Sequence, residues 1–130
     1  MLKNRNVIKA IKRRLIPMEV ERAVTALNKV TGRHEVQTLP PVLGKGCFQQ
    51  LNRKSSDSAD DLMLLSEGER TEATTVLWTQ AELKAGDQDS LSVSDKIIEL
   101  RTGRRFKVLL VRDKFYGNFN RAILAKVRDE

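Results

Sequence analysis

The chain has 130 residues, of which 40% are hydrophobic and 32% are charged, and its formal net charge is +7. This length gives room for one domain, and the balance of apolar and charged residues is that of a globular protein. The single Cys47 excludes an internal disulfide and a Cys-based zinc site, and the single His34 leaves little for catalysis. We therefore expect no enzyme, no catalytic residues, no metal and no cofactor.

The sequence predicts neither a membrane span nor a secretion signal. No apolar run approaches the ~20 residues of a membrane helix, and basic residues interrupt the apolar N-terminal stretch before any cleavage site. We expect a protein that stays in a reducing cytoplasm, where Cys47 is a buried structural thiol. The positive charge favours polyanions such as nucleic acid as partners.

Residues 2–16 predict a basic amphipathic helix, which we expect to end at Pro17 and to form a separate segment over residues 1–17. The apolar positions share one face: Val7, Ile8, Ile11 and Leu15. The basic positions fill the rest: Lys3, Arg5, Lys9, Lys12, Arg13 and Arg14. This helix can contact DNA phosphates, lie on an anionic membrane, or dock its apolar face on a neighbouring subunit.

The next stretch predicts three short strands. Residues 19–30 fit both a helix and a strand, and their β-branched residues favour the strand. A turn at Thr31–Arg33 and an extended piece over 35–39 follow. We expect Gly44–Gly46 to be a turn leading into a strand over 47–51, because its spacing does not fit a phosphate-binding loop.

Residues 52–72 predict a long loop. It begins with a polar tract whose carboxylates match no calcium-binding pattern: Asp57, Asp60 and Asp61. An apolar patch follows: Leu62, Met63, Leu64 and Leu65. Because a long loop in a small domain is usually functional or disordered, we expect this patch to be buried against a partner subunit.

The second half predicts a strand over 74–79, with Val76 and Trp78 on one face, and further strands over 96–100, 105–111 and 121–127. A loop is expected at 86–90, a tight turn at Thr102-Gly103, and a longer loop over 115–120. Such short connections favour an antiparallel meander. The predicted fold is mainly β, a small antiparallel barrel or sandwich with long loops, formed by residues 18–130 after the short basic helix.

Two further groups of residues have alternative explanations. Arg101, Arg104 and Arg105 surround a hairpin turn, where they either face DNA or keep a sheet edge soluble. The aromatic residues Phe115 and Tyr116, with Phe119, lie between basic residues, where they either stack on single-stranded bases or fold back into the core.

The order of several segments resembles the head-tail joining proteins of tailed bacteriophages, also called head completion, stopper or collar proteins. The segments that carry the resemblance are Gly46–Gln50, Ser66–Thr71, Val76–Leu83, Ser94–Val108 and Val111–Ala122. The fourth, Ser94–Val108, is similar to the family's Asp-x-Ile … Gly-x-x-Tyr-x-Val pattern, with Phe106 in the Tyr place. The last is similar to its Val-x-Asp-(aromatic)-x-Tyr-Gly ending. Residues 1–17 lie outside the match.

The resemblance implies a homo-oligomeric ring in the virion neck, assembled in the host cytoplasm. Such a ring lies beneath the portal, closes the filled head and joins it to the tail. Its partners are copies of itself, the portal or adaptor protein, tail proteins, and genomic double-stranded DNA that passes through the lumen without sequence readout.

On this hypothesis, the DNA-facing candidates are Lys9, Lys12, Arg13, Arg101, Arg104 and Arg105. The candidates for subunit or partner contacts, expected to be buried only in the assembly, are Ile8, Ile11, Leu15, Leu62, Met63, Leu64 and Leu65. Two alternatives remain open. One is a stand-alone basic β-barrel that binds nucleic acid, and the other, within the phage class, is a tail terminator.

Overall fold

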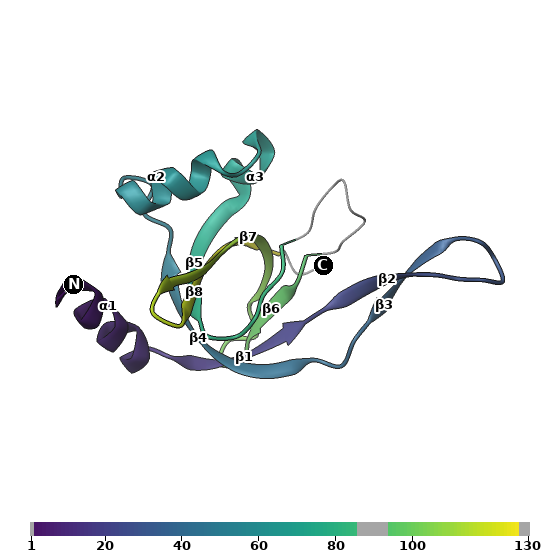
Figure 1. Ribbon diagram of the computed structural model, residues 1–130, viewed down its shortest axis with the longest axis horizontal. Coiled ribbons are helices and arrows are strands. Elements are labelled where there is room, and N and C mark those ends of the chain that lie inside the picture. The colour runs from purple at the N-terminus through teal and green to yellow at the C-terminus, as the bar shows by residue number, and fades with distance from the viewer. Residues whose placement is uncertain (1, 86–93, 128–130) are drawn as a thin grey trace.

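The computed structural model describes residues 2–85 and 94–127, and the side chains of residues 2–5, 25, 26 and 34 are outside the description. The predicted loop at 86–90 therefore lies outside the described residues. The elements, in chain order (Figure 1), are α1 (Leu2–Arg13), β1 (Ile16–Glu21), β2 (Ala23–Leu27), β3 (His34–Thr38), β4 (Val42–Gln50), α2 (Ser56–Met63), α3 (Glu67–Glu72), β5 (Ala73–Thr79), β6 (Lys96–Glu99), β7 (Arg105–Tyr116) and β8 (Phe119–Lys126).

Six strands form a closed antiparallel barrel in the order β1-β4-β5-β8-β7-β6. Closure occurs at β1, which pairs with β4 on one side and with β6 on the other. The barrel therefore has no free strand edge, the feature that natural sheets otherwise protect against unwanted pairing. The predicted fold class is confirmed, with a barrel rather than a sandwich, and β6, β7 and β8 form the predicted meander.

The barrel interior is a closely packed apolar core. Its buried residues come from five of the six strands and the segment after β5: Met18, Val20, Leu77, Leu83, Ile97, Phe106, Val108, Ala122 and Leu124. Gly46 of β4 faces this core, where an added Cβ would lie 2.5 Å from Leu77 Cδ1 and 2.9 Å from Met18 Sδ. Only a glycine gives these two side chains the space they occupy.

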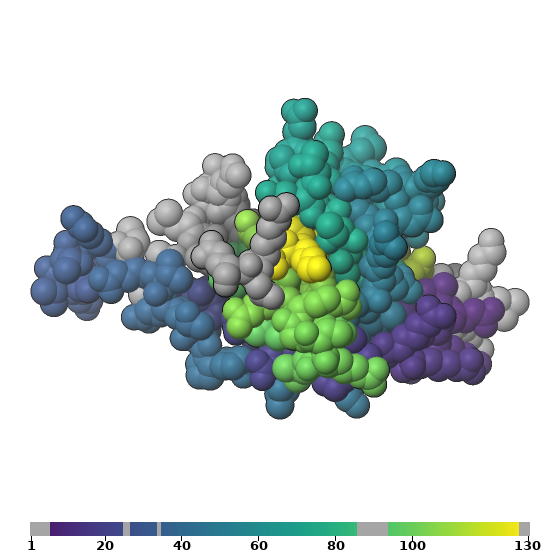
Figure 2. Space-filling view, turned by 180° about the vertical axis from the view of Figure 1, so that it is seen from behind, coloured from purple at the N-terminus to yellow at the C-terminus, as the bar shows by residue number. Residues whose placement is uncertain are grey.

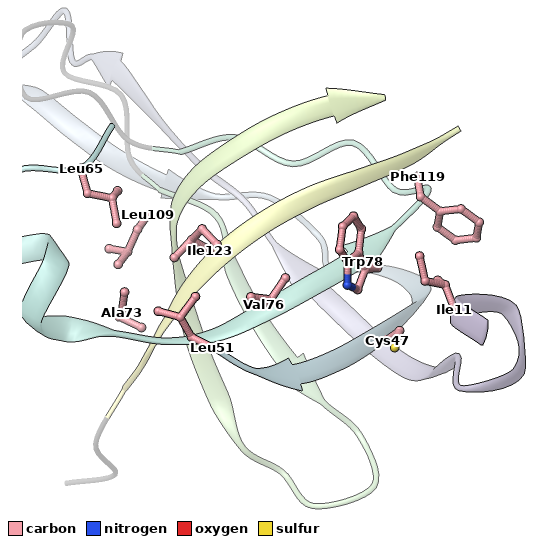
Figure 3. Close-up of a cluster of buried hydrophobic side chains, with 11 residues drawn as sticks. Ile11, Cys47, Leu51, Leu65, Ala73, Val76, Trp78, Leu109, Phe119 and Ile123 are labelled. Atoms are coloured by element: carbon pink, nitrogen blue, oxygen red, sulfur yellow. The ribbon is translucent and has the colours of Figure 1, made fainter. Parts of the chain in front are cut away.

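A second apolar core lies outside the barrel, between one side of its wall and the helices (Figure 3). Val76 and Trp78 of β5 point into it, as their alternation predicted, while Leu77 between them points into the barrel. Leu65, which follows α2, and Ile11 of α1 cover this side. Strand β8 lies between the two cores, and every residue from Phe119 to Ala125 is buried.

Strands β2 and β3 form a separate two-stranded antiparallel ribbon, which we call the arm. Thr31–Arg33 lies in the connection between them, where Gly32 has a φ of +70°, so the predicted turn is confirmed. Figure 1 shows the arm projecting away from the barrel on the side opposite α1, and Figure 2 shows the same from behind. Nothing in the sequence had predicted that these two strands would leave the barrel.

Two local predictions were wrong in the N-terminal half of the chain. Pro17 does not end the helix, because the helix already ends at Arg13 and Pro17 lies inside β1. Pro17 has no N–H to donate, but its carbonyl accepts a hydrogen bond from Leu100 N at 3.2 Å. Gly44–Gly46 is not a turn but part of β4, where it pairs with Ile16–Met18 of the neighbouring strand β1.

The segment 52–72 is not a loop but contains two short helices. Ser55 caps α2 by accepting a hydrogen bond from Ser58 N, and Ser66 forms a capping box with Glu69 at the start of α3. The Ser-x-x-Glu spacing of this box was visible in the sequence. The helices are too short to show an apolar repeat, so the sequence pattern of this segment indicates a polar loop.

The connection between β7 and β8 is also shorter than predicted. Strand β7 continues to Tyr116, and β8 begins at Phe119, which pairs with Tyr116. Only Gly117 and Asn118 form the turn. Gly117 has a φ of +58°, a left-handed conformation that glycine adopts without strain. The result is a long hairpin, which places Phe115 and Tyr116 over the barrel wall.

Candidate functional site

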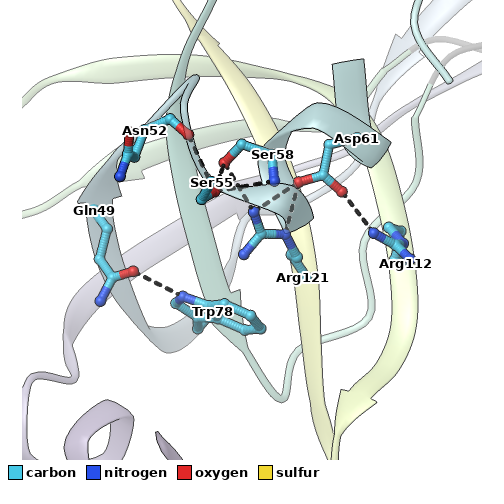
Figure 4. Close-up of polar contacts among 8 residues, drawn as sticks. All are labelled: Gln49, Asn52, Ser55, Ser58, Asp61, Trp78, Arg112 and Arg121. Atoms are coloured by element: carbon cyan, nitrogen blue, oxygen red, sulfur yellow. Dashed lines mark hydrogen bonds and ion pairs between the residues drawn. The ribbon is translucent and has the colours of Figure 1, made fainter. Parts of the chain in front are cut away.

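A buried ionic cluster fixes α2 to the barrel wall (Figure 4). Asp61 is fully buried and accepts hydrogen bonds from Arg121 Nε at 2.7 Å and from Arg112 Nη1 at 2.9 Å. Ser58 Oγ, one turn earlier on α2, accepts from Arg121 Nη2 at 3.4 Å. Both carboxylate oxygens of Asp61 are occupied by the two guanidinium groups, so the cluster is a structural anchor.

Aromatic rings enclose the two guanidinium groups of this cluster. Arg121 lies over the Trp78 ring at 4.9 Å, and Arg112 lies over the Phe115 ring at 4.6 Å. Trp78 in turn stacks on Tyr116 at a centroid distance of 5.2 Å. These contacts combine cation–π attraction with exclusion of water, which strengthens the ion pairs beneath them.

The packing of these rings bears on the two explanations of the aromatic residues. Phe119 is 2% exposed, so for this residue the fold-back into the core is confirmed and stacking on single-stranded bases is wrong. Phe115 and Tyr116 are partly buried against the outer core, so the fold uses part of each ring.

A second buried carboxylate fixes the root of the arm. Asp95, which is fully buried, accepts from Arg22 Nε at 3.1 Å, from Arg22 Nη2 at 2.9 Å and from Lys84 N at 2.8 Å. Arg22 is the single residue between β1 and β2. The hydrogen bond to Asp95 raises the pKa of Arg22 above its ordinary value, although burial opposes this. This pair holds the point where the chain leaves the barrel.

The candidate DNA-facing residues are all exposed. Lys9, Lys12 and Arg13 lie on α1, which runs directly into β1. The turn that carries Arg101 and Arg104 follows β6, and its neighbour Leu100 is hydrogen-bonded to Pro17 at the start of β1. The two basic groups are therefore brought to the same end of β1, and Figure 2 shows both segments on one face. Arg104 is partly neutralised, because it forms an ion pair with Glu99.

The candidate contact residues fall into two groups. Ile11 and Leu65 are 2% and 5% exposed, so the prediction that they are buried only in an assembly is wrong. Ile8, Leu15 and Leu62 are partly buried against the same outer core, so they too are covered mostly by their own chain. Met63 and Leu64 are 74% and 62% exposed, and only these two keep apolar surface free for a partner.

Sequence reasoning missed a groove beside the root of the arm. It has a volume of about 610 Å³, and its walls come from the end of the arm, the start of β4, the segment after β5 and the start of β8. Its apolar lining includes Leu39, Val42, Leu43, Ala81 and Phe119. Leu43 is 72% exposed, so the groove presents apolar surface outward. No motif marks it, because segments far apart in the sequence form it.

Sequence reasoning also missed that the arm is uncovered. Leu27, Val30 and Val36 are 57%, 94% and 62% exposed on this ribbon. The β-branched residues of 19–30 predicted a strand, and strands in a small domain are normally buried on at least one face. No signal in the sequence distinguished these strands from those of the barrel.

The described residues hold no metal centre that we can identify. Within 2–85 and 94–127, no group of three or more His, Cys, Asp and Glu side chains could hold a metal ion. In the same part of the chain, no helix is both long and apolar enough to cross a membrane. Cys47 is 1% exposed, as predicted for a structural thiol, and burial raises its pKa, which disfavours the reactive thiolate.

Comparison of the sequence with family models and with curated proteins adds no relative to this description. No family model matches the chain, and no curated protein matches it significantly. What the structure defines is a class of architecture: a mainly β protein with a closed six-stranded antiparallel barrel, a short N-terminal helix and a projecting arm.

Proposed function

We propose that this protein is a structural component of the neck of a tailed phage. It forms a ring beneath the portal, closes the DNA-filled head and joins it to the tail. The ring is built from copies of this chain, and its outer faces contact the portal or adaptor protein and the tail proteins.

The observation that carries this proposal is the order of the segments that resemble head-tail joining proteins. Gly46–Gln50 lies in β4, Ser66–Thr71 spans the cap of α3, and Val76–Leu83 begins in β5. Within the later segments, Gly103 and Gly117 are turn residues with positive φ. Four of the five segments thus lie on strands or turns of one barrel, and the fifth begins the helix that precedes β5.

The distribution of surfaces supports an assembly part. The three buried carboxylates among the described residues, Asp61, Asp95 and Glu99, are each paired with an arginine. Most of the exposed large apolar residues lie on the arm, in the groove and at Met63 and Leu64. Exposed apolar patches of this kind mark sites of protein contact. The basic residues of α1 and of the turn after β6 supply a surface that could contact DNA phosphates without reading sequence.

Electron microscopy of virions, and of portal complexes mixed with the purified protein, tests the proposal directly. We expect a ring of this protein between the portal and the tail. Density on the tail side only, with none against the portal, would identify a tail terminator instead. Absence of the protein from both particles would contradict the proposal.

The second candidate, a basic barrel that binds nucleic acid by itself, is favoured by one observation. The exposed cations of α1 and those of the turn after β6 lie at the same end of β1. If this is the function, the isolated protein binds short DNA with an affinity that falls steeply as salt increases. Lys12→Glu and Arg101→Glu would then weaken binding, whereas Lys54→Glu, in the exposed segment before α2, would change it less.

A further inference from the structure

The arm exposes apolar side chains that its own chain does not cover. Val30 at its tip is 94% exposed, and Leu27 and Val36 are more than half exposed. A two-stranded ribbon without a covering layer is only marginally stable in water. Each strand also has one edge without a backbone partner among the described strands. The arm therefore has both the apolar surface and the free backbone edges of a segment that docks on another surface.

The groove at the root of the arm is the matching feature on the same chain. Its volume of about 610 Å³ is within the range of cavities that hold small ligands or groups of side chains. Its lining is mainly aliphatic, with Leu43 and Val42 exposed at 72% and 63%. Aliphatic side chains such as Leu27 and Val30 suit this lining better than a polar ligand would.

The arm cannot fill the groove of its own chain. Leu39 and Pro40 directly follow the last strand of the arm and line the groove, so the arm starts at the groove's own wall. From Ala23 to Leu27 the strand β2 extends roughly 13 Å at the usual rise per residue, and the connection lies beyond it. The tip is therefore held far from its own root, and Figure 1 shows it pointing away from the barrel.

Charge favours a second copy as the occupant. The groove is flanked by the exposed Lys45 and Glu82, and the tip region of the arm carries Glu35 and Arg33. Among the described residues, no ion pair is found for any of these four side chains. An arm seated in the groove of another copy can bring Glu35 towards Lys45 and Arg33 towards Glu82, which offsets the repulsion between two chains of charge +7.

We propose that the arm of one copy docks in the groove of the next, so that copies associate head to tail. Such a contact is heterologous, and it closes into a ring when the rotation between neighbours allows it. As the subunit contact of the proposed ring it rests on that function, but its test needs only the purified protein. If the arm–groove contact fails its test, the proposed position of the protein in the virion neck is not affected. If the protein is not found in the neck, the arm–groove contact can still stand.

The experiment compares self-association of the full chain and of three variants by sedimentation velocity. Val30→Asp disables the arm, Leu43→Asp disables the groove, and Val127→Asp is the control, at an exposed apolar position after β8 that belongs to neither surface. We expect the wild type to associate at about 100 μM. Each of the first two variants should associate roughly a hundredfold more weakly, or not at all. The control associates like the wild type.

Mixing the two disabled variants gives the sharpest result. Val30→Asp retains an intact groove and Leu43→Asp retains an intact arm, so an equimolar mixture can form one arm–groove contact and no more. We expect a dimer containing one copy of each, although each variant alone is monomeric. A wild type that stays monomeric, a mixture that does not dimerise, or a loss of association in the Val127→Asp control would each overturn the proposal.

Discussion

The barrel and the arm are built from the same kinds of residue but end in opposite environments. Val20 in β1 is 5% exposed, whereas Val24, four residues later in β2, is 38% exposed, and Val30 at the tip is 94% exposed. Both segments are antiparallel β structure. The difference is that β1 has partners on both sides in a closed wall, whereas β2 has one partner and no layer over it. Closure, rather than composition, decides which apolar residues stabilise the fold and which are left for a partner.

The largest expected effect concerns the anchor between α2 and the barrel. Asp61→Ala leaves Arg121, which is 5% exposed, without its carboxylate. Loss of one partner from a buried ion pair costs about 3–5 kcal/mol of the free energy of unfolding. Chemical denaturation measures this loss. Asp60→Ala, the exposed neighbour on the same helix, is the control and should stay within about 0.5 kcal/mol of the wild type. Equal effects of the two changes would mean that the cluster anchors nothing.

The second prediction compares the two regions directly. Val108→Ala removes two methyl groups from the barrel interior, where Val108 is fully buried, and should cost about 2–3 kcal/mol through lost burial and a new cavity. Val30→Ala makes the same chemical change on the arm and should change the stability of the monomer by less than about 0.5 kcal/mol. Urea denaturation at a protein concentration low enough to keep the chain monomeric provides both values. A comparable cost at Val30 would show that its own chain covers the arm.

The third prediction uses two glycines of one strand to test how tightly the barrel is filled. Gly46→Ala would place a Cβ against Leu77 and Met18 and should destabilise by about 1–2 kcal/mol, because the ends of both side chains can shift slightly. Gly44→Ala meets its nearest neighbours at 3.6 Å and 3.7 Å, an ordinary contact distance. It should be neutral or slightly stabilising, because alanine restricts the unfolded chain. Thermal unfolding of both variants distinguishes the two positions, and equal midpoints would exclude a filled interior at Gly46.

The smallest expected effect is a pH dependence of the stability that comes from Cys47 on β4. Burial raises the pKa of Cys47 in the folded state, whereas the unfolded thiol ionises near its ordinary value of about 8.5. Its contribution to stability is therefore complete below that pH and is lost as the pH rises towards the folded pKa. Between about pH 8.5 and 10, the unfolding midpoint of the wild type should fall more steeply than that of Cys47→Ala. Parallel curves for the two proteins would rule out the effect, and Val30→Ala should follow the wild type.

Much of the local structure was determined by the sequence alone. The alternation of Val76 and Trp78 about Leu77 predicted which side chains leave β5 on each face, because successive residues of a strand point in opposite directions. The turn at Gly103 was visible because glycine adopts a positive φ without strain. The basic helix followed from its 3.6-residue apolar repeat, although its end did not, because β1 begins before Pro17.

Only the tertiary structure decided what those elements are for. The sequence could not show that Ile11 and Leu65 meet over one side of the barrel wall, that Asp61 reaches Arg112 and Arg121 some fifty to sixty positions away, or that β2 and β3 leave the barrel. Local patterns report the preferences of neighbouring residues, whereas burial and exposure depend on which distant segments pack together. The groove and the uncovered arm exist only through that packing, and for this reason no motif predicted them.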